Sequence, residues 1–204
     1  MSIISNLRNK WGNSKSPVII DDENHITFDD LNEIDTDFLS IIKPGDIVAL
    51  IGDFNPISII TLFRLMDIGA IVMPLTVDTL SDHTDYFKTC SVNYVINNGK
   101  IKKLDKQTKV KSNLLVKFKR KKVGGMIFFS TGSTGEPKAI LHKTSLLLKK
   151  YQIPKKSYRT LNFLLFDHLG GINTLLHTVF NGGSIISTKD RTVKSIINIC
   201  KKNK

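Results

Sequence analysis

The first half of the chain alternates between short apolar runs and longer amphipathic stretches. Ile47–Ile51 is continuously apolar, which is typical of a strand buried on both faces of a parallel sheet. Ala70–Met73 and Tyr94–Ile96 predict two further short strands. A largely buried helix from Pro56 and a more polar helix from Ser81 fill the intervals between them. This alternation predicts an α/β sheet with mainly parallel strands and right-handed crossovers.

A hairpin pattern precedes this unit. Pro17–Ile20 and Ile26–Phe28 are rich in β-forming residues and flank a polar turn. Thr27 or Asp29 is well placed to cap a following helix. The expected apolar face of that helix comprises Leu31, Ile34, Phe38, Leu39 and Ile42.

The second half of the chain continues the mixture of strands and helices. Extended segments are predicted at Leu114–Phe118, Met126–Phe129, Ala139–His142, Leu161–Phe166 and Ser184–Ser187. Helices are predicted at Thr144–Tyr151, around Leu175–Phe180 and at Thr192–Cys200. The 204 residues suffice for one large or two small domains with a sizeable core.

The net charge of +12 raises the question of a nucleic-acid partner. Most of this charge lies in Lys100–Lys122, which holds eleven Lys or Arg residues and one acid, Asp105. Phe118 is the one aromatic residue of this segment, so the sequence does not indicate a stacking platform for bases. We therefore expect a solvated basic linker, in preference to a nucleic-acid or membrane-surface patch.

Membrane spans and cysteine frameworks are not indicated either. No apolar run approaches the ~20 residues that cross a bilayer, and residues 1–15 lack the apolar core of a signal peptide. Cys90 and Cys200 lie far apart without metal-ligand spacing. Free thiols in a reducing cytoplasm are therefore expected, and no metal site is predicted.

The loop Ser130–Lys138 carries the strongest functional signal. Gly132 and Gly135 let backbone N–H groups approach an anion without a Cβ in the way. Lys138 adds a positive charge, and Pro137 stiffens the chain before it. Hydroxyl groups that can donate to phosphate oxygens come from Ser130, Thr131, Ser133 and Thr134. These residue types in this order predict a loop that wraps a polyphosphate.

Two common phosphate-binding motifs do not fit this loop. The Walker pattern needs glycine where this chain has Pro137, and Ser or Thr where it has Ala139. No G-x-G-x-x-G dinucleotide fingerprint occurs. A plain Ser/Thr/Gly surface turn is the remaining alternative. It accounts neither for Pro137-Lys138 nor for the apolar strand before the loop.

The order of residues in Ser130–Lys138 resembles the phosphate-binding signature of the adenylate-forming enzymes. These include acyl-CoA synthetases, luciferases and the adenylation domains of peptide synthetases. Ala139 stands where many members have glycine. Further stretches resemble family segments in order and spacing, so that the resemblance covers nearly the whole chain: Ile26–Leu31, Lys43–Leu50, Ile68–Leu75 and Phe166–Gly171.

This resemblance implies layered, mostly parallel sheets flanked by helices, incomplete at the C-terminus, with subdomains over residues 1–112 and 113–204. It implies activation of a carboxylic acid by ATP to an acyl-adenylate, then thioester formation with CoA or a phosphopantetheine carrier protein. Mg²⁺ is expected to be bound mainly by phosphates and by residues outside this chain. The residues expected to hold the pyrophosphate portion of ATP are Ser130, Thr131, Gly132, Ser133, Thr134, Gly135 and Lys138.

The resemblance also places His168, with Gly170 and Gly171, at the mouth of the acyl pocket, and assigns catalytic roles to Lys138 and His168. The alternative for His168 is a histidine at a helix start that makes a local hydrogen bond. Asp167 is either a charged pocket residue or a solvent-exposed one.

Family members continue with adenine-binding, ribose-binding and hinge segments, followed by a small mobile domain with a catalytic lysine. Two interpretations follow. The chain is the N-terminal part of an acyl-activating ligase that needs a C-terminal half as its partner, or it is a non-catalytic remnant that binds phosphate or another protein. Under both, we expect that the chain alone does not form an acyl-adenylate.

Overall fold

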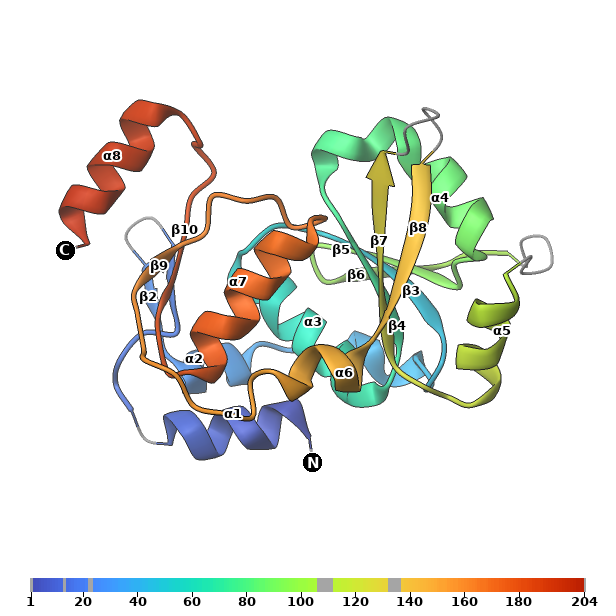
Figure 1. Cartoon of the computed structure of the whole chain (residues 1–204), viewed down its shortest axis with the longest axis horizontal. Coiled ribbons are helices and arrows are strands. Elements are labelled where there is room, and N and C mark those ends of the chain that lie inside the picture. Colours follow the sequence, from blue (N-terminus) through green and yellow to red (C-terminus); the bar gives the residue numbers. More distant parts are fainter. Residues whose placement is uncertain (1, 13, 22–23, 106–111, 132–136, 204) are drawn as a thin grey trace.

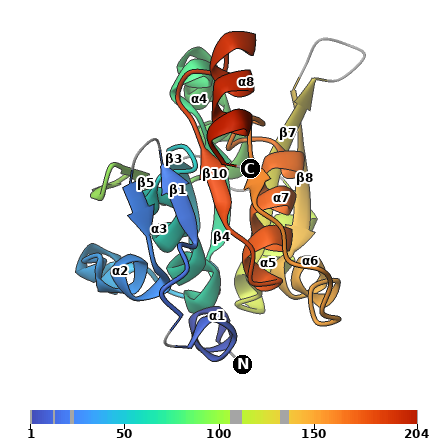
Figure 2. The same cartoon turned by 90° about the vertical axis from the view of Figure 1, so that its left-hand side faces the viewer.

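Two mainly parallel sheets organise the chain (Figure 1, Figure 2). The computed structural model describes residues 2–12, 14–21, 24–105, 112–131 and 137–203. Over these residues the larger sheet has the strand order β6 (Lys100–Lys103), β5 (Tyr94–Asn97), β3 (Ile47–Ile51), β4 (Ile71–Leu75), β7 (Gly125–Thr131), β8 (Pro137–Lys143). The smaller sheet has the order β2 (Asn24–Ile26), β1 (Ile19–Asp21), β10 (Ile185–Ser187), β9 (Thr160–Leu161). The predicted fold class, α/β with mostly parallel sheets, is confirmed.

The central strands of the larger sheet all run in one direction. β3 pairs in parallel with β4, Ile47 lying opposite Ile71, and with β5, Val48 lying opposite Tyr94. β4 pairs in parallel with β7, whereas the edge strands β6 and β8 are antiparallel to their neighbours. The carboxyl ends of β5, β3, β4 and β7 therefore meet at one edge of the sheet. Open α/β sheets bind their ligands at this edge.

Helix α3 (Pro56–Ile68) forms where the sequence predicts it. The Asn55 side chain accepts a 2.9 Å hydrogen bond from the Ser58 N–H, which caps the first turn next to Pro56. The helix ends at Gly69, whose φ of 81° is the left-handed conformation that favours glycine.

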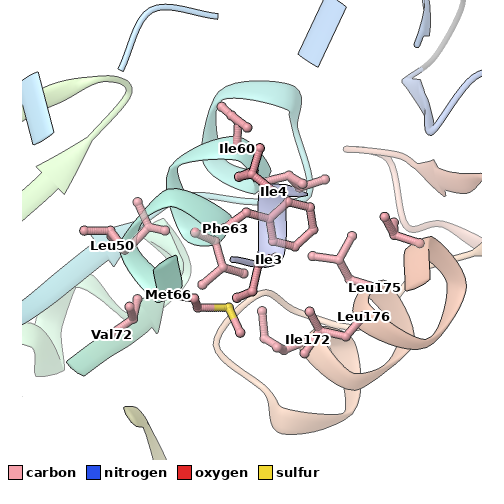
Figure 3. Close-up of a cluster of buried hydrophobic side chains, with 14 of the residues drawn as sticks. Ile3, Ile4, Leu50, Ile60, Phe63, Met66, Val72, Ile172, Leu175 and Leu176 are labelled. Atoms are coloured by element: carbon pink, nitrogen blue, oxygen red, sulfur yellow. The ribbon is translucent and has the colours of Figure 1, made fainter. Parts of the chain in front are cut away.

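The side chains of α3 form the centre of the main hydrophobic core. Figure 3 shows Phe63 and Met66 of this helix between Leu50 of the larger sheet and two other helices. These helices are α1 (Ile3–Trp11) and α7 (Leu169–Phe180). Phe63 is 0% exposed, and full burial of such a side chain contributes about 1.5–3 kcal/mol. The layer of α1, α3 and α7 thus holds the larger sheet against the rest of the molecule.

Two helices differ from the expectations drawn from the sequence. α1 was not predicted at all. α5 (Asn113–Arg120) replaces the strand expected at Leu114–Phe118, so that prediction was wrong. Leu115 and Phe118 lie three positions apart, and both pack in the core on one side of the larger sheet, while basic residues occupy the outer face of the helix. The Ser112 hydroxyl caps its first turn by accepting from the Leu115 N–H. The described parts of the basic segment are therefore folded into β6 and α5, and do not form a simple linker.

Two other elements are shorter than expected. The helix predicted to run to Ile42 divides into α2 (Phe28–Glu33), capped by Thr27 as predicted, and a 3-10 helix at Asp37–Ile41. Its break falls at Ile34, which has an extended ψ of 125°. The strand predicted at Leu161–Phe166 was largely wrong, because only Thr160–Leu161 pairs as β9. The remaining helices are α4 (His83–Cys90), α6 (Thr144–Lys149), α8 (Val193–Lys202) and a second 3-10 helix at Val77–Asp82.

Both sheets combine strands from the two parts of the chain, residues 1–112 and 113–204. β10 and β9 extend the hairpin of β1 and β2, and β7 and β8 extend the sheet begun by β3 and β4. The division into subdomains at residue 112 stays a prediction.

Candidate functional site

The hydroxyl-rich loop connects two antiparallel strands at the carboxyl edge of the larger sheet. β7 and β8 pair up to the base of the loop, with Ser130 opposite Lys138 and Thr131 opposite Pro137. The extended segments predicted on both sides of the loop, at Met126–Phe129 and Ala139–His142, are confirmed as β7 and β8. The other residues predicted to bind phosphate lie outside the described residues: Gly132, Ser133, Thr134 and Gly135.

A cavity of about 400 Å³ lies beside the base of this loop. Ser130 and Pro137 form one part of its lining, and Asp167 and His168 form another. These two pairs come from different strand–loop units, separated by α6 and β9 in the chain. The cavity therefore brings together the phosphate-loop residue Ser130 and the predicted acyl-pocket residue His168.

Asp167 is held at the cavity by hydrogen bonds from another segment of the chain. Its carboxylate lies 2.7 Å from Nδ1 of His168 and accepts longer bonds from the hydroxyls of Thr76, at 3.3 Å, and Thr79, at 3.4 Å. The Asp167 side chain is 11% exposed and that of His168 is 65% exposed. Asp167 is thus a charged pocket residue, which decides between the two alternatives left by the sequence. The Thr79 hydroxyl also lies 3.2 Å from Nε2 of the buried His83.

The local hydrogen bond expected under the alternative interpretation of His168 is also present. Its partner is the neighbouring Asp167, and His168 is the N-cap residue of α7. The imidazole nevertheless lines the cavity and is mostly exposed. A hydrogen bond to Asp167 through Nδ1 leaves Nε2 as the ring nitrogen that can meet a ligand.

An aromatic pair forms the apolar wall of the cavity. The rings of Tyr86, from α4, and Phe129, from β7, stack with centroids 3.7 Å apart and planes 10° from parallel. Pro74 and Leu75, at the end of β4, continue this wall. The sequence gave no signal that Tyr86 would meet Phe129. A cavity with apolar walls and a few polar groups at its mouth suits a small organic ligand.

The two glycines after His168 differ in their surroundings. A Cβ on Gly171 would lie 2.4 Å from the carbonyl oxygen of Leu165 and 2.9 Å from the ring of Phe54. A Cβ on Gly170 would meet only Leu164 Cδ1, at 3.2 Å. Gly171 therefore has a packing role, and the role of both glycines in substrate binding stays a prediction.

Lys138 lies on β8 opposite Ser130 and is exposed. This position lets the ammonium group reach solvent at the base of the loop, as a phosphate ligand requires. Its catalytic role stays a prediction, as does the phosphate-binding role of the Thr131 hydroxyl.

An ion pair lies beyond the carboxyl ends of β3 and β10, where the sequence gave no signal. Nη2 of Arg191 lies 2.8 Å and 2.9 Å from the two carboxylate oxygens of Asp53. Asp53 follows β3 and Arg191 follows β10, so the pair connects the two sheets. The two side chains are 36% and 26% exposed, respectively, and such partly exposed pairs contribute about 1 kcal/mol or less.

The described part of the chain contains no group of three or more His, Cys, Asp or Glu residues placed to hold a metal ion. None of its helices is both long enough and apolar enough to span a bilayer.

The architecture is that of several solved structures. The N-terminal domain of FACL13 from Mycobacterium tuberculosis superposes with a TM-score of 0.74 at 16% identity, covering 98% of this chain and 60% of that one. The luciferase-like enzyme from the mealworm Zophobas morio superposes with a TM-score of 0.71 at 16% identity, covering 98% of this chain and 56% of that one. The Klebsiella oxytoca NpsA N-terminal subdomain in complex with 3-hydroxybenzoyl-AMSN superposes with a TM-score of 0.70 at 16% identity, covering 98% of this chain and 55% of that one.

The chain has the fold of the N-terminal domain of adenylate-forming enzymes. It spans little more than half the length of these structures. No family model and no curated protein matches the sequence. The adenylate-forming fold is therefore established by structure at sequence identities of 10–16%, while activity, substrates and partners are matters of proposal.

Proposed function

We propose that this chain supplies the phosphate loop and the mouth of the acyl pocket for ATP-dependent activation of a carboxylic acid. The observation that carries this proposal is the shared cavity, lined by Ser130 at the base of the hydroxyl loop and by the Asp167–His168 pair. The similarity to an NpsA subdomain whose structure holds an acyl-AMSN adenylate analogue adds support. The product is an acyl-adenylate, which then passes its acyl group to the thiol of CoA or of a carrier protein.

In the proposed reaction, a carboxylate oxygen of the acid forms a bond to the α-phosphorus of ATP. The bond from that phosphorus to the bridging oxygen breaks, and pyrophosphate leaves with the electron pair. Negative charge therefore grows on the leaving phosphates. Ser130, at this end of the cavity, and Lys138, opposite it on β8, are the groups proposed to meet such charge. Fixed donors of this kind act by positioning and by electrostatic stabilisation.

The acid lies at the other end of the cavity in this proposal. Nε2 of His168 is the hydrogen-bonding group for the substrate carboxylate, because Nδ1 is engaged by Asp167. The stacked Tyr86 and Phe129 rings pack against its acyl part. Thr76 and Thr79 position His168 indirectly, since they hold the carboxylate to which it is bonded.

Mg²⁺ would accompany ATP in such a reaction and neutralise phosphate charge. The described residues do not fit a dedicated site for it, because they form no cluster of carboxylates or histidines. The proposed roles of this chain are therefore confined to phosphate binding and substrate positioning. The free thiols of buried Cys90 and exposed Cys200 fit the proposed reducing, cytoplasmic location.

The phosphate role is tested by calorimetric titration of the chain with inorganic pyrophosphate. Lys138→Ala is expected to weaken binding about tenfold, the size of one lost charge-assisted hydrogen bond. Lys143→Ala is the matched control, since Lys143 is also an exposed lysine, at the other end of β8. Thermal unfolding of both variants should match that of the unchanged chain. Equal affinities of the two variants for pyrophosphate would contradict the proposal.

The alternative function is that of a module that binds phosphate or another protein without catalysis. ATP–pyrophosphate exchange with a panel of carboxylic acids distinguishes the two functions when the chain is tested alone and with a completing partner. We expect no exchange by the chain alone. Exchange only with the partner supports the ligase. Pyrophosphate binding without exchange in either case supports the module.

A further inference from the structure

A buried histidine that the proposed reaction does not use lies next to the candidate site. His83 is the first residue of α4 and is 3% exposed. Its ring packs near that of Phe87, with centroids 5.8 Å apart, and its Nε2 atom lies 3.2 Å from the hydroxyl oxygen of Thr79. Buried polar atoms of native proteins are hydrogen-bonded, because desolvation without a partner costs free energy. The contact with Thr79 therefore links His83 to the polar groups of the cavity.

Thr79 connects this histidine to the Asp167–His168 pair. Thr79 lies at a kink inside the 3-10 helix Val77–Asp82. Besides Nε2 of His83, its hydroxyl oxygen contacts Oδ2 of Asp167 at 3.4 Å and the carbonyl oxygen of Thr76 at 3.3 Å. The other oxygen of Asp167 lies 2.7 Å from Nδ1 of His168. A continuous chain of side chains thus runs from the buried start of α4 to the imidazole that lines the cavity.

The Thr79 hydroxyl has one hydrogen to donate and two lone pairs with which to accept, so the direction of each contact can be assigned by counting. The carboxylate of Asp167 and the carbonyl of Thr76 are both acceptors of this hydrogen. If Nε2 of His83 were an acceptor too, three atoms would compete for it. Donation from Nε2–H removes that conflict and leaves the hydroxyl to donate to the carboxylate, whose charge makes it the stronger acceptor. The geometry therefore favours the Nε2–H tautomer of His83.

Asp167 depends on such hydroxyl donors. Its side chain is 11% exposed, and among the described residues no lysine or arginine forms an ion pair with it. Apart from His168, its side-chain donors in that part of the chain are the hydroxyls of Thr76 and Thr79. A mostly buried carboxylate is stable only when its oxygens are hydrogen-bonded. A Thr79 hydroxyl that turned away would remove one of these donors.

We propose that His83 is a positioning residue for His168. Its Nε2–H donates to Thr79 and so directs the Thr79 hydroxyl at Asp167, which accepts in turn from Nδ1–H of His168. The tautomer of a neutral imidazole is set by the hydrogen bonds that its nitrogens make, so this chain of bonds leaves Nε2 of His168 for the cavity. The first turn of α4 then organises both sides of the cavity, since it also carries Tyr86 of the apolar wall. The inference deepens the proposed function and rests on it for the role of His168.

The test is ¹⁵N NMR of the histidine rings in the full chain, at a pH where the rings are neutral, because protonated and unprotonated ring nitrogens give well-separated signals. We expect the Nε2–H tautomer for His83 and the Nδ1–H tautomer for His168. Thr79→Val should lower the ratio of Nδ1–H to Nε2–H in His168 by about two- to tenfold, the range for one net hydrogen bond. His83→Leu should act in the same direction and less strongly, because the Thr79 hydroxyl remains.

Conservative variants separate this role from packing. Thr79→Ser keeps the hydroxyl, and His83→Gln keeps an N–H donor on a side chain that can reach Thr79, so both should retain the His168 signals of the unchanged chain. His177→Leu is the matched control: His177 is a half-buried histidine of α7, the helix that His168 caps, and its ring lies near Tyr151. This control should leave the His168 tautomer unchanged.

Three results would overturn the proposal. The first is an Nδ1–H tautomer of His83 in the unchanged chain, a measurement that needs no variant to fold. The second is an unaltered His168 tautomer in folded Thr79→Val. The third is an equal change in His83→Gln and His83→Leu, which would assign His83 to packing alone. Pyrophosphate titration of the same samples distinguishes failure of the proposed function: expected tautomers without pyrophosphate binding would refute the phosphate role and leave the positioning of His168 intact.

Discussion

The adjacent residues Gly170 and Gly171 allow a matched test of whether the glycines at the start of α7 serve packing. Alanine is a better helix former than glycine by about 1 kcal/mol, so helix propensity alone predicts that both Gly→Ala variants are stabilised. Their surroundings predict opposite results. At Gly171 the new Cβ would lie 2.4 Å from the Leu165 carbonyl oxygen, a backbone atom that cannot rotate away. At Gly170 it would meet only the end of the flexible Leu164 side chain, at 3.2 Å.

The magnitudes follow from these distances. Overpacking a rigid site costs about 1–3 kcal/mol, and a contact with fixed backbone belongs at the upper end of that range. After the gain in helix propensity, Gly171→Ala should lose about 1–2 kcal/mol of unfolding free energy. For a chain of this size that corresponds to about 2–8 °C in Tm. Gly170→Ala should be unchanged or more stable by up to about 1 kcal/mol.

Urea denaturation followed by circular dichroism measures both variants, and thermal melting provides a second readout. Pyrophosphate titration on the same samples shows whether the site is kept. A Gly171→Ala variant as stable as the unchanged chain would refute the packing argument. Equal destabilisation by the two substitutions would refute it as well, because only one of them meets a backbone atom.

Two further predictions concern the core. Burial raises the pKa of the Cys90 thiol to about 12. A thiol reagent at pH 8 should therefore label exposed Cys200 rapidly and Cys90 only on unfolding. Prompt labelling of both thiols in the folded chain would contradict this prediction. The Phe63 side chain is 0% exposed and lies between sheet and helices. Phe63→Ala should therefore lower the unfolding free energy by about 3–5 kcal/mol, measured by urea titration. A loss below about 1 kcal/mol would contradict this and show that the core can collapse around the site.

Elements buried on both faces could be predicted from the sequence. β3 and β4 are continuous apolar runs because each lies between two parallel neighbours under covering helices. α3 has a start and an end encoded locally, by Asn55-Pro56 and by Gly69. Such signals need no knowledge of the rest of the chain, and the structure confirms them.

Elements whose burial depends on distant partners could not be predicted. α5 places only Leu115 and Phe118 toward the sheet, and five residues of mixed pattern fit a strand as well as a helix. β9 has the composition of a strand but only one neighbouring strand in the described structure. In both cases the local sequence is compatible with two conformations, and tertiary contacts decide between them.

The candidate site shows the same division. Ser130 and His168 each carry a local signal, and the structure places both at one cavity. The burial of Asp167 had no such signal, because the hydroxyls of Thr76 and Thr79 that hold it come from 91 and 88 positions earlier in the chain. No periodicity or motif links residues at that separation.

These contacts also explain why the cavity forms where it does. Asp167 belongs to the segment between β9 and α7, whereas Thr76 and Thr79 follow β4 of the larger sheet. The Asp53–Arg191 ion pair makes a second connection between the two sheets at their carboxyl ends. The position of His168 relative to Ser130 is therefore set by how the sheets pack on the layer of α1, α3 and α7.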